Sequence, residues 1–173
     1  MQHPLVKLAE LAVTSYITKG ATIVPPDWIP KKYINTNAGT FVTIKENNEL
    51  RGCIGTYAPT KENVAKEIIT NAIDAATSDP RFKPIGIKDL GNLSYEVYIL
   101  EKPEQIKSLS ELNPQKLGVI VFSSQKNSSA LLLPSLEGID SVEQQLSCVT
   151  QKAGIDPRQE KLTIIKFKTE KFG

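Results

Sequence analysis

An asparagine pair in the first third of the chain most strongly constrains its fold. Two short segments that are predicted to be strands, 41–44 and 50–54, flank Asn47 and Asn48. Asparagine tolerates the left-handed backbone conformation that tight hairpin turns require. A second pair of apolar segments, 119–122 and 130–133, flanks the polar run 125–128. The sequence therefore predicts two antiparallel hairpins.

Helical periodicity appears in separate stretches between and around these hairpins. Residues 4–19 repeat apolar side chains every three or four positions, with Pro4 suited to the first turn and Gly20 to the stop. Residues 60–77 repeat the pattern, with Thr60 as the expected N-cap and Asp79 before Pro80 as the end. Helices that do not alternate strictly with strands favour an α+β fold with antiparallel sheets.

The last third of the chain carries its own helix signals. Ser141 and Gln144 have the spacing of a capping box, and Gly154 is the expected stop of the helix that they begin. Residues 93–100 and 162–167 are predicted as further strands. We expect residues 1–173 to form a single domain.

Composition excludes several classes of protein. Hydrophobic residues make up 40% and charged residues 23% of the 173 residues, which is ordinary globular usage. A formal net charge of +2 argues against a dedicated nucleic-acid partner. No apolar run reaches the length of a membrane span, and the N-terminus has no secretory leader pattern. We therefore expect a cytoplasmic protein with no membrane association.

The second strand of the first hairpin carries one of the two cysteines. Regular alternation would place Arg51 and Cys53 on one face, with Gly52 on the other. If the asparagine pair forms the turn, Thr43 lies opposite Gly52 and Val42 lies opposite Cys53. A guanidinium beside a thiol favours the thiolate, which is the reactive form of cysteine.

Two interpretations of this strand remain open. Gly52 and Gly55 flank the thiol, and glycine inside a strand marks a bulge or a close backbone approach, which would let a ligand reach the sulfur. Alternatively, Cys53 is a buried small hydrophobe, as free cysteine often is. Cys148 lies in an apolar helical pattern and is expected in the core.

Other candidate groups are sparse. Glu96 interrupts an apolar strand, on the face shared with Ser94 and Tyr98, and either meets water at a sheet edge or faces a cleft. His3 is the only histidine and lies near a terminus expected to be mobile. One histidine and two distant cysteines predict no metal site of the usual kinds, an all-carboxylate site has no spacing signature, and no phosphate loop or dinucleotide motif occurs. The sequence does not identify a cofactor.

The six residues Leu50-Arg51-Gly52-Cys53-Ile54-Gly55 resemble the signature of the AMME chromosomal-region protein family, called protein A of the AmmeMemoRadiSam system in prokaryotes. Further segments that resemble the family follow in the expected order over nearly the whole chain. They are Phe41-Val42-Thr43-Ile44, Ser78-Asp79-Pro80-Arg81-Phe82, Tyr95-Glu96-Val97, Gly118-Val119-Ile120-Val121, Leu132-Leu133-Pro134 and Lys152-Ala153-Gly154.

The resemblance implies a compact α+β domain of two lobes with the signature near the cleft between them. It also implies functional association with a Memo-like protein and a radical S-adenosylmethionine protein. The chain departs from many relatives by having Gln144, Gln145 and Gln159 where they have an aromatic, acidic stretch. The candidate catalytic residues are Cys53, Arg51 and Glu96, and the candidate binding residues are Gly52, Gly55, Thr56, Asp79 and Arg81.

The leading hypothesis is a component of a small-molecule or protein-modification pathway. Cys53 would act as a nucleophile or contact a ligand, Arg51 would hold an anionic group, and Glu96 or Asp79 would accept a proton. For Asp79 and Arg81 we also predict a structural role, with Arg81 pairing with a carboxylate such as Glu96. The alternatives are a non-catalytic protein-interaction module and, with less support, an RNA-binding domain.

Overall fold

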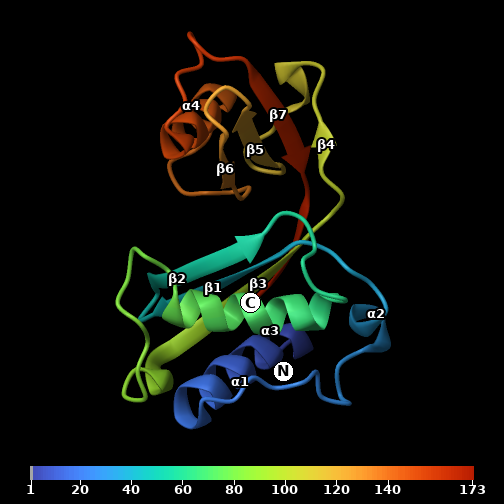
Figure 1. The fold of residues 1–173 in the computed structure, drawn as a ribbon, viewed down its shortest axis with the longest axis vertical. Helices are drawn as coiled ribbons and strands as arrows, with labels where there is room; N and C mark the ends of the chain where they lie inside the picture. The colour runs from blue at the N-terminus through green and yellow to red at the C-terminus, as the bar shows by residue number, and fades with distance from the viewer. Residues whose placement is uncertain (1) are drawn as a thin grey trace. The chain divides into compact units, whose positions relative to one another are not determined.

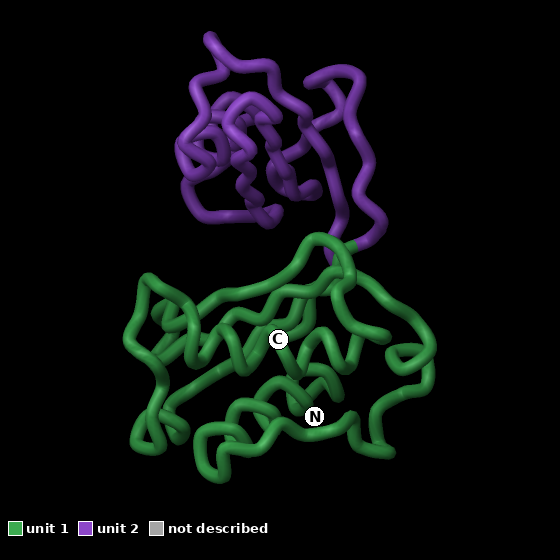
Figure 2. The backbone as a smooth tube through the Cα atoms, viewed as in Figure 1, with its two compact units in different colours: residues 1–100, 170–173 green, residues 101–169 purple. Residues whose placement is uncertain are grey.

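The computed structural model describes residues 2–173 and shows an α+β fold with two antiparallel sheets (Figure 1). The chain divides into two compact units (Figure 2). Unit 1 contains the residues up to Leu100 together with Glu170–Gly173, and unit 2 contains Glu101–Thr169. Unit 2 is therefore an insertion within the chain of unit 1.

Unit 1 contains a four-stranded sheet in the order β2-β1-β3-β8. Its strands are β1 (Thr40–Glu46), β2 (Glu49–Thr56), β3 (Leu93–Leu100) and β8 (Thr169–Phe172). Its helices are α1 (Pro4–Lys19), α2 (Lys31–Ile34) and α3 (Val64–Thr77), with a short 3-10 turn at Leu90–Asn92. Helices α1 and α3 lie against one face of the sheet (Figure 1), and that face carries the fully buried side chains of Val42, Ile44 and Val97.

Local signals set the ends of α1 but not the start of α3. Helix α1 begins at Pro4 and is followed by Gly20, whose φ of 65° is left-handed, as predicted. Helix α3 begins at Val64 and is capped by Asn63, so the prediction of Thr60 as N-cap was wrong. Thr60 instead donates both its backbone N–H and its hydroxyl to the carboxylate of Glu67.

The first hairpin forms at the predicted turn. Asn47 and Asn48 have φ values of 52° and 68°, as a type I′ turn requires. The register shifts between Ile44, which pairs with Gly52, and Lys45, which pairs with Leu50. Arg51 is thus the extra residue of a β-bulge. Because of this bulge, the predicted pairs Thr43–Gly52 and Val42–Cys53 were wrong.

Unit 2 contains the second sheet, in the order β4-β7-β5-β6, and one long helix. Its elements are β4 (Glu104–Gln105), a 3-10 turn (Leu109–Glu111), β5 (Gly118–Ser123), β6 (Ser128–Leu132), α4 (Val142–Ala153) and β7 (Leu162–Phe167). The predicted hairpin, the Ser141–Gln144 capping box and the left-handed Gly154 stop are all confirmed. Cys148 packs against the unit 2 core, as expected.

The insertion leaves and rejoins unit 1 at neighbouring strands. β3 ends at Leu100 and β8 begins at Thr169, and these two strands lie side by side in the sheet. The Glu101 backbone N–H donates to the Lys168 carbonyl at 3.0 Å, which holds the two connecting segments together. Among residues 2–173, no helix has the length and apolar character needed to cross a membrane.

Candidate functional site

Cys53 lies in a row of polar side chains on the sheet face away from α1 and α3. Thr43 in the middle strand β1 pairs with Cys53 on one side and with Glu96 on the other. Directly opposed residues project on the same face, so the three side chains share it. The Thr43 Oγ1 and Cys53 Sγ atoms are 3.2 Å apart, and the Cys53 side chain is half-buried. We call this surface, with Cys53, Thr43 and Glu96, the Cys53 face.

Glu96 is held by cations at the interior of the sheet. It accepts hydrogen bonds from Lys45 Nζ at 2.8 Å, Lys171 Nζ at 3.0 Å and the Tyr98 hydroxyl at 3.0 Å. Burial raises the pKa of the carboxyl, but these hydrogen bonds outweigh it and leave the pKa below its ordinary value. Glu96 is therefore an ionised and fully engaged carboxylate on an inner strand, not a side chain in water at a sheet edge.

Tyr98 is the neighbour most affected by that charge. Burial and the adjacent Glu96 carboxylate both raise the pKa of its phenol. Its hydroxyl stays protonated and donates to Glu96. Lys171 Nζ also lies 5.5 Å from the centre of the Tyr98 ring. Strand alternation had placed Tyr98 on the face of Glu96, whereas Lys45 and Lys171 were missed, because they lie close to Glu96 only through the pairing of different strands.

Asp79 and Arg81 hold the backbone of Cys53 at the exposed edge of the sheet. The Cys53 N–H donates to Asp79 Oδ2 at 2.9 Å, and Arg81 Nη2 donates to the Cys53 carbonyl at 3.3 Å. Strand β2 is an edge strand, so these two groups would otherwise face away from any partner strand. The two side chains thus replace one residue of a neighbouring strand at Cys53.

Asp79 and Arg81, which we call the Asp79–Arg81 clamp, are also paired with each other. Arg81 Nε lies 3.0 Å from Asp79 Oδ1 and Arg81 Nη2 lies 2.7 Å from Asp79 Oδ2, a bidentate pair. The Arg81 hydrogen bond, helped by the Cys53 N–H, lowers the Asp79 pKa from 3.8 to about 2 against the effect of burial. Arg81 therefore pairs with Asp79, and the prediction of a pair with Glu96 was wrong.

Arg81 is a guanidinium that interacts electrostatically with Cys53. Asp79 is the main cause of the raised pKa of Arg81, and the charge of Cys53 adds to it. Arg51 donates to the Lys83 carbonyl at 2.5 Å and lies 3.5 Å from a Glu46 carboxylate oxygen. The bulge turns Arg51 toward the segment after α3, so the placement of Arg51 beside Cys53 by simple alternation was wrong.

The two glycines of the signature allow close packing. A Cβ atom on Gly52 would lie 2.1 Å from the backbone oxygen of Ala75 in α3. A Cβ atom on Gly55 would lie 2.3 Å from the Phe41 ring. The close approaches that the glycines predicted are therefore made by protein segments. The approach at Gly52 brings the strand of Cys53 against α3, and the approach at Gly55 is to Phe41 of β1.

Thr56 contacts a buried acid that the sequence reasoning missed. Its hydroxyl donates to Glu67 Oε1 at 2.7 Å, and Glu67 also accepts from Thr60 and from the Lys61 N–H. Glu67 is only 1% exposed. Burial raises its pKa, but the hydrogen bonds lower it below the ordinary value. A sequence signal existed, because Glu67 falls among the apolar positions of α3.

The remaining titratable candidate lies at the start of α1. His3 Nδ1 accepts the Leu5 N–H at 3.3 Å, and the ring stacks on Phe172 with centroids 4.1 Å apart. His3 is therefore a helix cap packed against β8, and not a mobile terminal side chain. In the described part of the chain, residues 2–173, no cluster of three or more His, Cys, Asp or Glu side chains is arranged to hold a metal ion.

The comparisons with known proteins cover nearly the whole chain. A protein of Thermotoga maritima is 44% identical over 172 residues, which are 99% of this chain and 98% of that protein. Protein CA_C1420 of Clostridium acetobutylicum is 43% identical over 167 residues, 96% of this chain, and the match spans only 35% of that longer protein.

A solved structure shows the same fold. The crystal structure of the uncharacterized protein PH0010 from Pyrococcus horikoshii matches with a TM-score of 0.88 and 33% sequence identity. The match covers 96% of this chain and 88% of that one. The AMMECR1 family model matches residues 6–172. The chain therefore belongs to the AMMECR1 family.

Proposed function

We propose that the Cys53 face is the working surface of a component of a small-molecule or protein-modification pathway. The observation that carries this proposal is the position of the thiol. Cys53 Sγ is half-buried, 3.2 Å from the Thr43 hydroxyl, and its own backbone is clamped by Asp79 and Arg81. A side chain on an immobilised backbone is positioned for a ligand without a further entropic cost on binding.

In this proposal Arg81, and not Arg51, is the arginine that holds an anionic group beside Cys53. Its side chain is 53% exposed although two of its nitrogens are bonded to Asp79. A guanidinium in that position favours the Cys53 thiolate and can contact an anionic group of a ligand. Arg51 stabilises the site indirectly, because it donates hydrogen bonds to carbonyl groups of the segment that follows the Asp79–Arg81 clamp.

Cys53 is the nucleophile or the ligand-contacting thiol of the proposed site. Glu96 is already bonded to two lysines and a tyrosine, so it orients the lysines instead of accepting a proton. Asp79 has a pKa of about 2 and is likewise a poor base. We propose that a proton acceptor comes from the ligand or from a partner protein.

The partners in the proposal follow from the family resemblance. A Memo-like protein and a radical S-adenosylmethionine protein are the expected associates, and the cytoplasm is the expected compartment. A Cys53 face that only binds such a partner, without chemistry, is the competing function. The two differ in thiol reactivity, because a protein-interaction module does not need an activated thiol.

The test is competitive alkylation of the native protein with iodoacetamide, followed by mass spectrometry of both cysteine sites. We expect Cys53 to react faster than Cys148, which packs against the unit 2 core. Arg81→Gln should slow Cys53 several-fold relative to Arg51→Gln, since Arg81 is a guanidinium that interacts with it. Circular dichroism and urea unfolding must show both variants folded.

Two results decide between the proposals. If Cys53 reacts only when the protein is unfolded, the thiol proposal is wrong and the interaction module replaces it. If Cys53 reacts, the wild-type protein and a Cys53→Ser variant are compared in metabolite capture. A ligand retained by the wild type and lost from the variant then identifies what the thiol contacts.

A further inference from the structure

A second candidate site lies in unit 2, where α4 covers only part of the sheet. Helix α4 packs on β5 and β6, and Val121 of β5 is fully buried in the core that includes Val149 of α4. Val121 pairs with Ile164 of β7, so Ile164 projects toward the same face. Ile164 and its neighbour Leu162 are only partly buried. The single helix therefore leaves apolar side chains of β7 accessible beside it.

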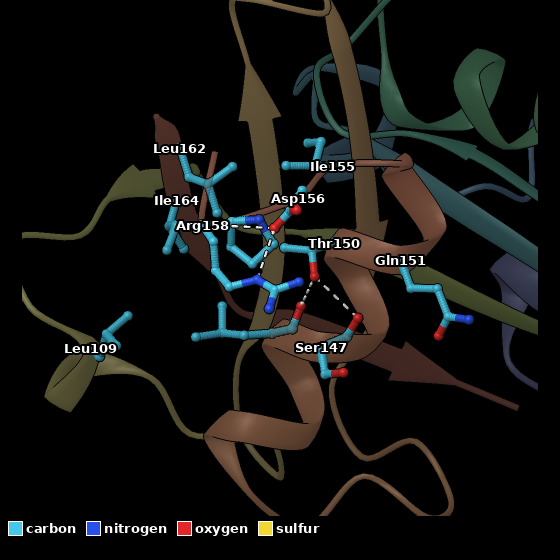
Figure 3. Close-up of a pocket in the computed structure, with 11 residues that line it drawn as sticks. Leu109, Ser147, Thr150, Gln151, Ile155, Asp156, Arg158, Leu162 and Ile164 are labelled. Carbon is cyan, nitrogen blue, oxygen red and sulfur yellow. Dashed lines mark hydrogen bonds and ion pairs between the residues drawn. The ribbon is translucent and has the colours of Figure 1, made fainter. Parts of the chain in front are cut away.

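A pocket of about 740 Å³ occupies this position (Figure 3). Its apolar lining comes from β7, α4 and the segments around them. These residues are Leu109, Leu146, Ile155, Pro157, Leu162 and Ile164. The volume lies in the range of pockets that bind small organic molecules. Every lining residue belongs to unit 2, so the pocket is complete within that unit.

One cation, Arg158, lies on the solvent side of this apolar lining, and its side chain is 89% exposed. Arg158 lies between Ile164 on β7 and Thr150 on α4 (Figure 3). Asp156 Oδ1 accepts the Arg158 backbone N–H at 3.0 Å and its Nε at 3.4 Å. These contacts hold the inner edge of the guanidinium and direct the terminal nitrogens away from Asp156. The terminal edge is the part of arginine that binds a carboxylate in a bidentate manner.

We infer that this pocket binds a small molecule with an apolar body and one carboxylate. The apolar body would cover Leu162 and Ile164, and the carboxylate would receive the Arg158 terminal nitrogens. Such a ligand matches both features of the lining, because Asp156 pairs with Arg158 only through Nε and a wholly apolar ligand would not use the terminal nitrogens. The inference is independent of the Cys53 face, because none of the lining residues belongs to unit 1.

The test uses octanoate, octanol and octylamine as probes of the full-length protein, measured by isothermal titration calorimetry. Octanoate should bind about tenfold more tightly than octanol, because a charge-assisted hydrogen-bonded pair is added. Octylamine should bind more weakly than either. Arg158→Gln should remove the preference for octanoate over octanol. Lys161→Gln, an exposed neighbouring cation outside the lining, should preserve that preference.

A second pair of variants tests the apolar wall. Leu109 is 51% exposed and lines the pocket, whereas Leu136 is 36% exposed and does not. Leu109→Ser should weaken octanoate and octanol to a similar degree, and Leu136→Ser should weaken neither. Both leucines are exposed enough that the variants should fold, which thermal unfolding would verify.

Three outcomes would overturn the inference. Equal affinity for octanoate and octanol would show that the site does not recognise a carboxylate. Equal effects of the two leucine variants would show that the ligand does not bind in this pocket. A wild-type dimer in light scattering that Leu109→Ser dissociates would assign the surface to a second copy of the chain. Repeating the titration with Cys53→Ser separates the two proposals, since octanoate binding should persist without the thiol.

Discussion

The carboxylate of Asp79 accepts the backbone N–H of Cys53 at 2.9 Å, across 26 positions of sequence. The same carboxylate is paired with Arg81, which in turn donates to the Cys53 carbonyl. The segment after α3 is thereby fastened to the edge strand at the residue whose side chain we propose to be functional. The arrangement ties the stability of this segment to the position of the thiol.

The first prediction concerns the strength of this clamp. Asp79→Asn replaces a carboxylate oxygen by an amide group that cannot accept hydrogen bonds and removes the charge that pairs with Arg81. We expect a loss of about 2 kcal/mol in the free energy of unfolding, measured with urea. Asp74→Asn is the matched control, because Asp74 lies half-exposed on α3. Equal stability of the two variants would show that the clamp contributes little.

The second prediction is the pH dependence of that contribution. The folded-state pKa of Asp79 is lowered from 3.8 to about 2, so the unfolded chain binds the proton more readily. The stabilisation is therefore present above the unfolded value and is lost as the pH falls through the folded value. The difference in unfolding free energy between the wild type and Asp79→Asn should shrink steadily between about pH 5 and about pH 2. A difference that is constant over this range contradicts the assignment.

A third prediction concerns the packing of Gly52. A methyl group there would lie 2.1 Å from the Ala75 backbone oxygen, and a helix backbone cannot move aside like a flexible side chain. Gly52→Ala should cost about 3 kcal/mol of unfolding free energy. At Gly91 the added Cβ would meet nothing within 4 Å, so Gly91→Ala serves as the control and should be nearly neutral. Comparable urea midpoints for the two variants would refute the close approach.

The fourth prediction concerns the buried carboxylate of Glu67. Its two oxygens accept only from neutral donors, the hydroxyls of Thr56 and Thr60 and two backbone N–H groups. Glu67→Gln would turn an amide donor toward two of these donors and should cost about 3 kcal/mol. Glu62→Gln, at an exposed ion pair of the same segment, should leave the unfolding transition unchanged. The comparison is made by thermal unfolding at neutral pH.

Strand alternation gave the right elements but misplaced the side chains of the signature. It placed Arg51 and Cys53 on one face, but Leu50 is the residue that shares the face of Cys53, since the two pair with Lys45 and Thr43, two positions apart on β1. The cause is one extra residue, Arg51. Glycine inside a strand predicts a bulge or a close backbone approach, but Gly52 and Gly55 do not indicate that Arg51 is the inserted residue. Its side chain fits there because it forms an ion pair with Glu46 and donates a hydrogen bond to the Lys83 carbonyl.

The turns and helix ends that could be predicted from the sequence are those whose signals lie within a few neighbouring residues. Gly20, the asparagine pair at 47 and 48, and the capping box of Ser141 and Gln144 each act within one turn of the backbone. Their conformational preferences are properties of neighbouring residues, so they can be predicted without knowing the rest of the fold.

The surroundings of Cys53 and the start of α3 depend on contacts between residues that are distant in sequence. Thr60 and Asn63 are both of residue types that cap helices. Asn63 caps α3, whereas the backbone N–H and the hydroxyl of Thr60 donate to the Glu67 carboxylate. Likewise Cys53 meets Asp79, and Glu96 meets Lys171, only after strands and helix are packed. Such contacts join residues distant in sequence, and their formation depends on the packing of the whole unit instead of on the preferences of adjacent residues.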